Sequence, residues 1–271
     1  MSARRDEPSL FRVLLRHHRQ RRAMSQLDLS IAAEVSMRHI SFLETGRAAP
    51  SREMVLRLTA ALGLGLRETN ALLEAAGLPR AYAEMVRDHE WPAQVEHVLA
   101  RMLKQQEPYP MLVLNARYDI LRANQAALSL FSQFVADSSA VGARPNLCHA
   151  LFNPNLMRPF IENWEQLAPV VLAQLQREGL SRGSDTSISE LVRELCNYPE
   201  VPESWRRHAL ELPPAPILEV SLARNSRRLR FVTTLSSFNV VLDVGLEDLK
   251  LESYFPADEA TEAVCRKTAA R

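Results

Sequence analysis

The sequence has little or none of several features that would place it in a common class. It contains no apolar run of about 18 residues or more, so it has no candidate membrane-spanning helix. The charged N-terminus, Met1–Asp6, is not followed by the apolar stretch of a secretion signal. Its three cysteines, Cys148, Cys196 and Cys265, lie far apart and form neither a disulfide framework nor a pair of metal ligands. A reducing cytoplasm is therefore the expected compartment.

Catalytic motifs are missing as well. The chain has no glycine-rich phosphate loop, no Gly-x-Ser-x-Gly turn and no His-Glu-x-x-His pair. We therefore expect neither an enzyme nor a metal site.

Charge is nearly balanced overall but unevenly spread. The chain carries a net charge of +1, with +5 through Arg80 and −4 in the remainder. A basic front half predicts an anionic polymer as its partner, although a solvated charged face would look similar. His17 and His18 lie in the most basic segment, and we expect them to face phosphate groups.

Five helices are predicted in the first 80 residues, because serines suited to N-caps and glycines suited to C-caps separate short apolar segments. They span 9–22, 25–33, 36–45, 51–62 and 66–76, with the turn between the second and third at 34–35. The residues expected to face the core in the first three helices are Leu10, Val13 and Leu14, then Leu27, Leu29, Ile31 and Ala32, then Ile40 and Leu43.

The stretch SQLDLSIAAEVSMRHISFLETGRAAPS, residues 25–51, resembles the Xre/Cro repressor family, and the likeness extends over residues 9–78. Its motifs follow in order: Ser-Gln, Ala-Ala, Val-Ser, Ile-Ser, Leu-Glu, Gly-Arg and Pro-Ser. The resemblance implies a lambda-repressor-like, five-helix domain that binds double-stranded DNA through a helix-turn-helix. Glu34 is a departure, because the family usually has glycine in this turn.

The third helix is expected to enter the major groove, where side chains near its N-terminus meet base edges. Arg38 is suited to a guanine edge, Ser41 to several bases and Met37 to a thymine methyl group. The predicted DNA contacts are Gln26, Ser36, Met37, Arg38, His39, Ser41 and Arg47, with Gln26, Ser36 and Arg47 expected on phosphates. A helical bundle that contacts only proteins is the alternative.

The rest of the chain predicts an α+β domain with helices on one face of an antiparallel sheet. A hairpin is expected at 111–116 and 118–123, followed by a helix that Asn124 caps. Three more helices are expected at 147–152, 155–177 and 185–197, the second of them kinked or split at Pro169. Strands follow at 217–223, 228–237, 239–246 and 249–254. The domain limits are 1–80 for the front domain, 81–108 for a helical linker, 109–255 for the rear domain and 256–271 for a polar, frayed tail.

The phrases PMLVLNARYDILRANQAALSLF (110–131) and NLCHALFNPNLMRPFIENWEQLAPVVLAQLQRE (146–178), with Trp205, resemble the MmyB-like transcription regulators. The likeness spans 108–255 and implies a PAS-like domain that binds an elongated apolar molecule such as a fatty acid. No other cofactor is expected. The residues predicted to line that site are Leu114, Asn124, Phe131, Arg158, Phe160, Asn163, Trp164 and Val171, with Arg158 neutralising a carboxylate.

These features together predict a transcription regulator that binds a two-fold DNA operator as a homodimer and senses a small apolar ligand. Two alternatives stay open. The rear domain could serve only for dimerisation or for docking a protein partner, and its apolar residues would then be ordinary core. An enzyme tethered to DNA is the least favoured.

Overall fold

The computed structural model describes residues 10–82, 91–181, 187–208, 218–237, 246 and 248–269, and it divides into two compact units that part between Glu84 and Met85. None of the helices in these ranges is long and apolar enough to cross a membrane. Each unit is built around its own core.

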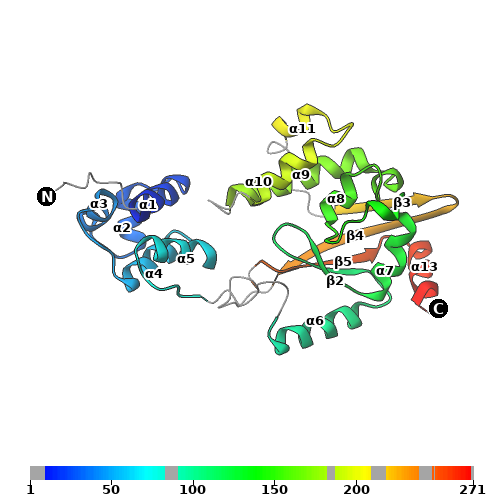
Figure 1. Ribbon diagram of the computed structural model, residues 1–271, viewed down its shortest axis with the longest axis horizontal. Helices are drawn as coiled ribbons and strands as arrows, with labels where there is room; N and C mark the ends of the chain where they lie inside the picture. The colour runs from blue at the N-terminus through cyan, green and yellow to red at the C-terminus, as the bar shows by residue number, and fades with distance from the viewer. Residues whose placement is uncertain are drawn as a thin grey trace. The chain divides into compact units, whose positions relative to one another are not determined.

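Within residues 10–82 the front unit has five helices, which Figure 1 labels α1 to α5. They are α1 (Leu10–Arg21), α2 (Gln26–Ala32), α3 (Met37–Thr45), α4 (Arg52–Ala61) and α5 (Leu66–Ala75). The side chains of Ser25, Ser36 and Ser51 cap α2, α3 and α4, and Gly46 ends α3 with a left-handed φ of 75°. The predicted helices are therefore confirmed to within a few residues.

The core of this unit uses partly different residues from those expected. In α1 the buried apolar side chains are Phe11 and Leu15, whereas Leu10 is 61% exposed. In α2 only Leu29 of the expected set is buried, and Ile31 is 69% exposed. Apolar residues occur on more than one side of these short helices, so periodicity alone did not identify the packed side. The expected core positions Ile40 and Leu43 of α3 are confirmed.

A buried ion pair joins the first three helices. Arg19 of α1 donates from Nε and Nη2 to the two carboxylate oxygens of Glu44 in α3, at 2.6 and 2.9 Å. Gln26, the first residue of α2, donates its side-chain amide to the same carboxylate at 2.8 Å. The Glu44 side chain is 1% exposed. Burial raises the pKa of Glu44, but the hydrogen bonds from Arg19 and Gln26 outweigh it and hold the pKa below its usual value.

The described residues of the rear unit form a five-stranded antiparallel sheet in the order β2-β1-β5-β4-β3, with helices packed on it. The strands are β1 (Met111–Leu114), β2 (Ile120–Ala123), β3 (Leu218–Arg224), β4 (Arg227–Ser237) and β5 (Lys250–Pro256). Its helices are α6 (Ala93–Gln106), α7 (Gln125–Phe131), α8 (Leu147–Phe152), α9 (Trp164–Ser181), α10 (Ser187–Cys196), α11 (Glu203–His208) and α13 (Glu259–Ala269). The strand predicted over 239–246 lies, but for its last residue, outside the described residues.

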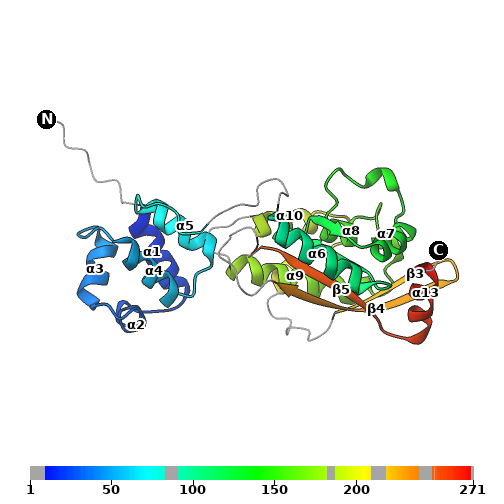
Figure 2. The ribbon, with the colours of Figure 1, turned by 90° about the horizontal axis from the view of Figure 1, so that it is seen from below.

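Helices pack on both faces of the sheet, not on one as predicted. Alternate residues of β1 and β5 point to opposite faces. Leu112, Leu114 and Tyr254 belong to the main core with α7–α10, on what we call the inner face. Met111, Val113 and Leu251 form a second core with Trp91 and α6 on the outer face. Figure 2 shows α6 lying along β5. The segment predicted as a linker therefore contributes a helix to the rear unit.

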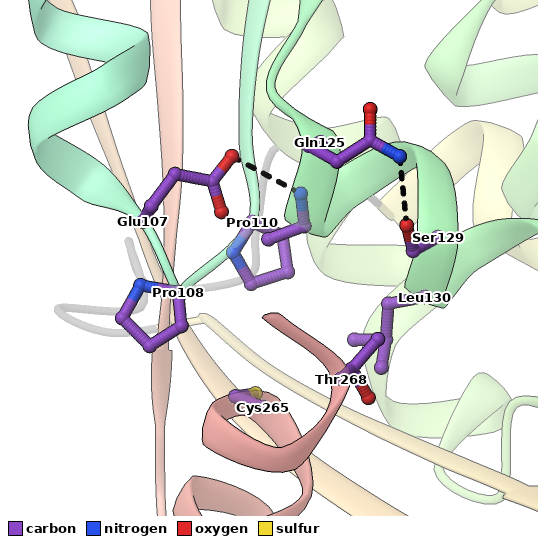
Figure 3. A pocket seen from close by; sticks show the side chains of 9 residues that line it. Glu107, Pro108, Pro110, Gln125, Ser129, Leu130, Cys265 and Thr268 are labelled. Carbon is purple, nitrogen blue, oxygen red and sulfur yellow. Dashed lines mark hydrogen bonds between the residues drawn. The ribbon is translucent and has the colours of Figure 1, made fainter. Parts of the chain in front are cut away.

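The C-terminal tail, predicted to be polar and frayed, forms α13 instead. The helix begins after an Asp258 side chain that accepts a hydrogen bond from the Thr261 amide at 2.7 Å. Thr261 and Cys265 are buried, and Tyr109 donates a hydrogen bond to Glu262 at 3.0 Å. Figure 3 shows Cys265 and Thr268 of α13 beside Gln125, Ser129 and Leu130 of α7, around a cavity of about 330 Å³. The tail is thus part of the rear unit.

Helix α9 begins nine residues later than predicted. Residues Arg158–Phe160 form a 3₁₀ turn. The side chain of Asn163 then bonds to β3: its Nδ2 donates to the Glu219 carbonyl at 2.8 Å, and its Oδ1 accepts from the Ser221 backbone amide at 3.0 Å. This attachment to the sheet precedes the first turn of α9. The helix continues through Pro169, so the predicted break into two helices does not occur.

Replacing Glu44 by Gln is expected to destabilise the front unit by about 3–5 kcal/mol, because the buried guanidinium of Arg19 loses its counter-charge. Hydrogen–deuterium exchange followed on peptides from α1–α3 measures this unit separately from the rear one. Glu53→Gln is the matched control. Glu53 pairs with Arg57 on the surface, its side chain is 81% exposed, and its loss is expected to cost about 0.5 kcal/mol or less. Equal protection from exchange in the two variants would contradict the stabilising role of the ion pair between Arg19 and Glu44.

Glu34 adopts a left-handed φ of 53° in the turn between α2 and α3. A side chain there is strained, so Glu34→Gly is expected to be more stable than Glu34→Ala by about 1 kcal/mol. Ala32→Gly, at the last helical position of α2, is the control. It is expected to be less stable than the wild type by about 1 kcal/mol, because glycine forms helices less readily than alanine. The same exchange measurement compares the three variants. A glycine at position 34 that is no better than alanine would show that the turn carries no strain.

Candidate functional site: a DNA-binding surface and cavities in the rear unit

The structure gathers several predicted DNA contacts at the N-terminal half of α3. Met37 and Arg38 are exposed there, and Arg47 is exposed just beyond the helix. The guanidinium groups of Arg38 and Arg47 lie 5.2 and 5.9 Å from the centre of the Phe42 ring. Such contacts with an aromatic ring restrict both arginines. Phe42 was not among the predicted residues, although its position four after Arg38 is the spacing of helical neighbours.

Other predicted contacts already have structural roles. The Ser36 hydroxyl caps α3 by accepting a hydrogen bond from the His39 backbone amide at 3.2 Å. The side-chain amide of Gln26 donates a hydrogen bond to the Glu44 carboxylate. His39 and Ser41 are half-buried. Met37 and Arg38 therefore stay candidates for base contacts, and Arg47 stays the predicted phosphate contact.

His18 does not face phosphate groups, contrary to expectation. Its side chain is 3% exposed and lies 3.9 Å from the Glu68 carboxylate. Burial first, and then the charges of His17, Arg21 and Arg22, lower its pKa from 6.5 to about 4. The ring is therefore neutral at pH 7 and belongs to the structural core.

Two further cavities of the rear unit lie on either side of α8. One, which we call the apolar cavity, has a volume of about 510 Å³ and is lined by α7, α8 and the loop before α8. The other, which we call the sheet cavity, has about 440 Å³ and lies between α9 and the sheet. Leu147 lines both.

The apolar cavity has mostly hydrocarbon walls. They include Leu112 and Ile120 from the hairpin, Ala127, Leu128 and Phe131 from α7, and Leu147, Ala150, Leu156 and Met157 from α8 and the segment after it. Arg144, His149 and Tyr198 are the polar groups of interest at its edge. The Tyr198 hydroxyl bonds to Nδ1 of His149 at 2.9 Å, and Nε2 of the same ring lies 3.2 Å from Glu194. Arg144 is exposed and makes no ion pair within the described residues.

The eight residues predicted for a ligand site do not meet in one place. Phe131 lines the apolar cavity, Val171 lines the sheet cavity, and Leu114 is fully buried in the core. Asn163 holds β3, and Phe160 packs against Phe134 with ring centres 6.3 Å apart.

Asn124 is a cap, since its Oδ1 accepts the amides of Met111 and Ala127, both at 3.0 Å. Arg158 is 8% exposed, donates to the Pro199 carbonyl at 2.6 Å, pairs with Glu200 and lies 4.0 Å from the centre of the Trp164 ring. Arg158 and Trp164 line another cavity, of about 580 Å³, beside Pro154 and Glu165. Arg158 is thus already neutralised, and Arg144 is the cation beside the apolar cavity. No sequence pattern singled out Arg144, because it lies in a predicted loop.

Comparison with protein families gives two matches. Residues 95–267 match the MmyB-like transcription regulator ligand binding domain, and residues 10–73 match a helix-turn-helix domain. The chain belongs to the MmyB-like family. The two matched ranges correspond to the rear and front units, so the chain joins a DNA-binding domain to a ligand-binding domain, as in a ligand-responsive transcription regulator. The sequence resemblances to a helix-turn-helix regulator and to the MmyB-like domain are confirmed.

No curated protein matches the chain. Among solved structures, an RNA-binding light-oxygen-voltage receptor is similar at 11% identity over 97% of this chain and 62% of the receptor chain, with a TM-score of 0.29. This chain thus spans less than two thirds of the receptor's length, and a likeness of this degree carries no argument.

Arg38→Ala is expected to cost about 1–3 kcal/mol at one operator position and to relax the base preference there. Arg47→Ala is expected to weaken binding to all sequences equally and to lower the salt slope of log K by about one. Binding to a randomised operator library, measured at several salt concentrations, separates the two effects. Uniform loss for Arg38→Ala would place that side chain on phosphate, and an unchanged salt slope for Arg47→Ala would remove it from the backbone contacts.

Proposed function

We propose that this protein is a transcription regulator that binds a two-fold DNA operator as a homodimer and responds to an elongated apolar molecule, such as a fatty acid, held in the apolar cavity. The observation that carries the ligand assignment is the cavity of about 510 Å³ with mostly hydrocarbon walls and, at its edge, Arg144, a cation with no ion pair to any described residue. Ligand sites in proteins commonly combine this range of volume with few polar groups.

The chemistry of a fatty acid fits this arrangement. An acyl chain gains about 0.8 kcal/mol for each methylene group that it buries against side chains such as Leu128 and Phe131. Its carboxylate can form a charge-assisted hydrogen bond with Arg144. The three cysteines are unpaired and buried, which agrees with the proposed location in the reducing cytoplasm.

Regulation requires that the ligand bind the DNA-competent and the DNA-incompetent arrangements with different affinity. Helix α7 and the loop over 136–146 supply much of the cavity wall, so the ligand acts on elements at the surface of the rear unit. A pair of rear units that rearranges with the ligand would change the spacing of the two α3 helices, which must match half-sites about one helical turn apart.

Decanoate is the probe for this proposal, with operator DNA as the readout. It is expected to bind the purified, delipidated full-length protein and to change its affinity for DNA. Arg144→Gln is expected to weaken decanoate binding about tenfold or more while leaving decanol unaffected, because only the acid uses the charge. Calorimetry gives the ligand affinities, and mass spectrometry of an organic extract identifies what co-purifies.

Arg101→Gln is the matched control, since Arg101 is an exposed arginine on α6 that lines neither cavity. Equal loss in both variants would contradict the role of Arg144. A clean extract, with intact DNA binding that decanoate does not change, would favour a rear unit used only for dimerisation or protein docking.

A further inference from the structure

The sheet cavity differs in chemistry from the apolar cavity. Its lining includes the apolar side chains of Leu151, Val171, Leu175 and Leu218, together with Gln174 of α9, Thr233 of β4 and Glu252 of β5. Glu252 projects from the inner face of β5, between Leu112 of β1 and Leu235 of β4, and is 8% exposed. A carboxyl group therefore lies against an open space of about 440 Å³ inside the unit.

Among the charged groups that the structure describes around this cavity, Glu252 adds a second carboxylate when it is ionised. The nearby ammonium group is that of Lys250, which pairs with Glu178 of α9 and lies 3.7 Å from the centre of the Tyr118 ring. Tyr118 donates a hydrogen bond to the same Glu178 at 2.7 Å. Lys250 and Glu178 thus neutralise each other, and the carboxylate of Glu252 is an additional negative charge.

Glu252 has limited compensation from its neighbours. Burial raises its pKa to about 7, against the lowering effects of a hydrogen bond with Tyr254 and of the Lys250 charge. A buried charge is costly unless a counter-charge and hydrogen bonds compensate it. A ligand ammonium would supply both. A ligand carboxylate would instead add a further negative charge beside Glu178 and Glu252.

We propose that the sheet cavity is a second ligand site, which binds a small aliphatic amine with its apolar body against Val171, Leu151 and Leu175 and its ammonium on the Glu252 carboxylate. This site goes beyond the proposed acid-binding site, from which α8 separates it. Leu147 lines both cavities, while Cys148 faces the sheet cavity and His149 the apolar one. A ligand in either cavity would therefore lie against α8.

Hexylamine, hexanol and hexanoate are matched probes, because they share one alkyl chain and differ in the charge of the polar end. Calorimetry with the full-length protein at pH 8 is expected to give hexylamine at least tenfold higher affinity than hexanol, and no binding of hexanoate in this cavity. Glu252→Gln is expected to reduce hexylamine affinity at least tenfold without changing decanoate binding. Decanoate binding and DNA binding thus report on the regulator's proposed function independently of this site.

Val171→Phe is a second variant, which fills the cavity from α9 and leaves Glu252 in place. It is expected to abolish hexylamine binding even if Glu252→Gln fails to fold. Lowering the pH from 8 to 6 is expected to weaken the binding of hexylamine, because the Glu252 carboxylate takes up a proton and loses its charge. Burial raises the pKa of Tyr118, Cys148 and Tyr254, so these three groups stay neutral over this range. The ion pair of Lys250 and Glu178 also lies beside Glu252.

Three results would each overturn the proposal. The first is that hexylamine does not bind. The second is that it binds the wild type, Val171→Phe and Glu252→Gln equally. The third is that hexanoate binds with a dependence on Glu252 and Val171, which would make this the acid site.

Discussion

The front unit depends on one buried ion pair, formed by Arg19 and Glu44. Five short helices of 7 to 12 residues bury few side chains each, and helices of this length are marginal by themselves. The bidentate bond between Arg19 and Glu44 fixes α1 against α3, and Gln26 adds the start of α2 to the same carboxylate. Because Glu44 is the second-to-last residue of α3, the pair also sets the orientation of the helix that presents Arg38. DNA recognition and stability therefore depend on the same side chains.

In the rear unit the corresponding constraint is the sheet, which is covered on both faces. α6 covers the outer face of β1 and β5, and α7–α10 and the two cavities beside α8 lie on the inner face. The alternation of β5 places Leu251 in the outer core and Lys250 and Glu252 on the inner face. A single strand thus supplies apolar packing on one side and buried charge on the other.

Local features of this fold could be predicted from the sequence, and long-range ones could not. Ser25, Ser36, Ser51 and Asn124 cap helices through bonds to residues three positions away, so a short window contains the whole interaction. The pair between Arg19 and Glu44 spans 25 residues, and no periodicity indicates it.

The candidate sites follow the same division. The exposed Arg38 and Arg47 were predictable from their place on and after a capped helix. The ligand residues were not. Arg158 lies in an apolar segment with helical spacing, but the 3₁₀ turn at Arg158–Phe160 directs it toward Glu200 and Trp164. Arg144 and Glu252 became candidates only when packing placed each of them beside a cavity.

Asn124 lies where three elements meet. Its Oδ1 receives amides from β1 and α7, and its Nδ2 donates to the Tyr109 carbonyl at 2.8 Å, just after α6. The polar atoms of one side chain are thus shared between a wall of the apolar cavity and the end of the helix that follows the front unit in the chain. A ligand that displaces α7 must either carry the end of α6 with it or break these bonds. Through these hydrogen bonds, Asn124 therefore couples the position of α7 to that of the segment that follows α6.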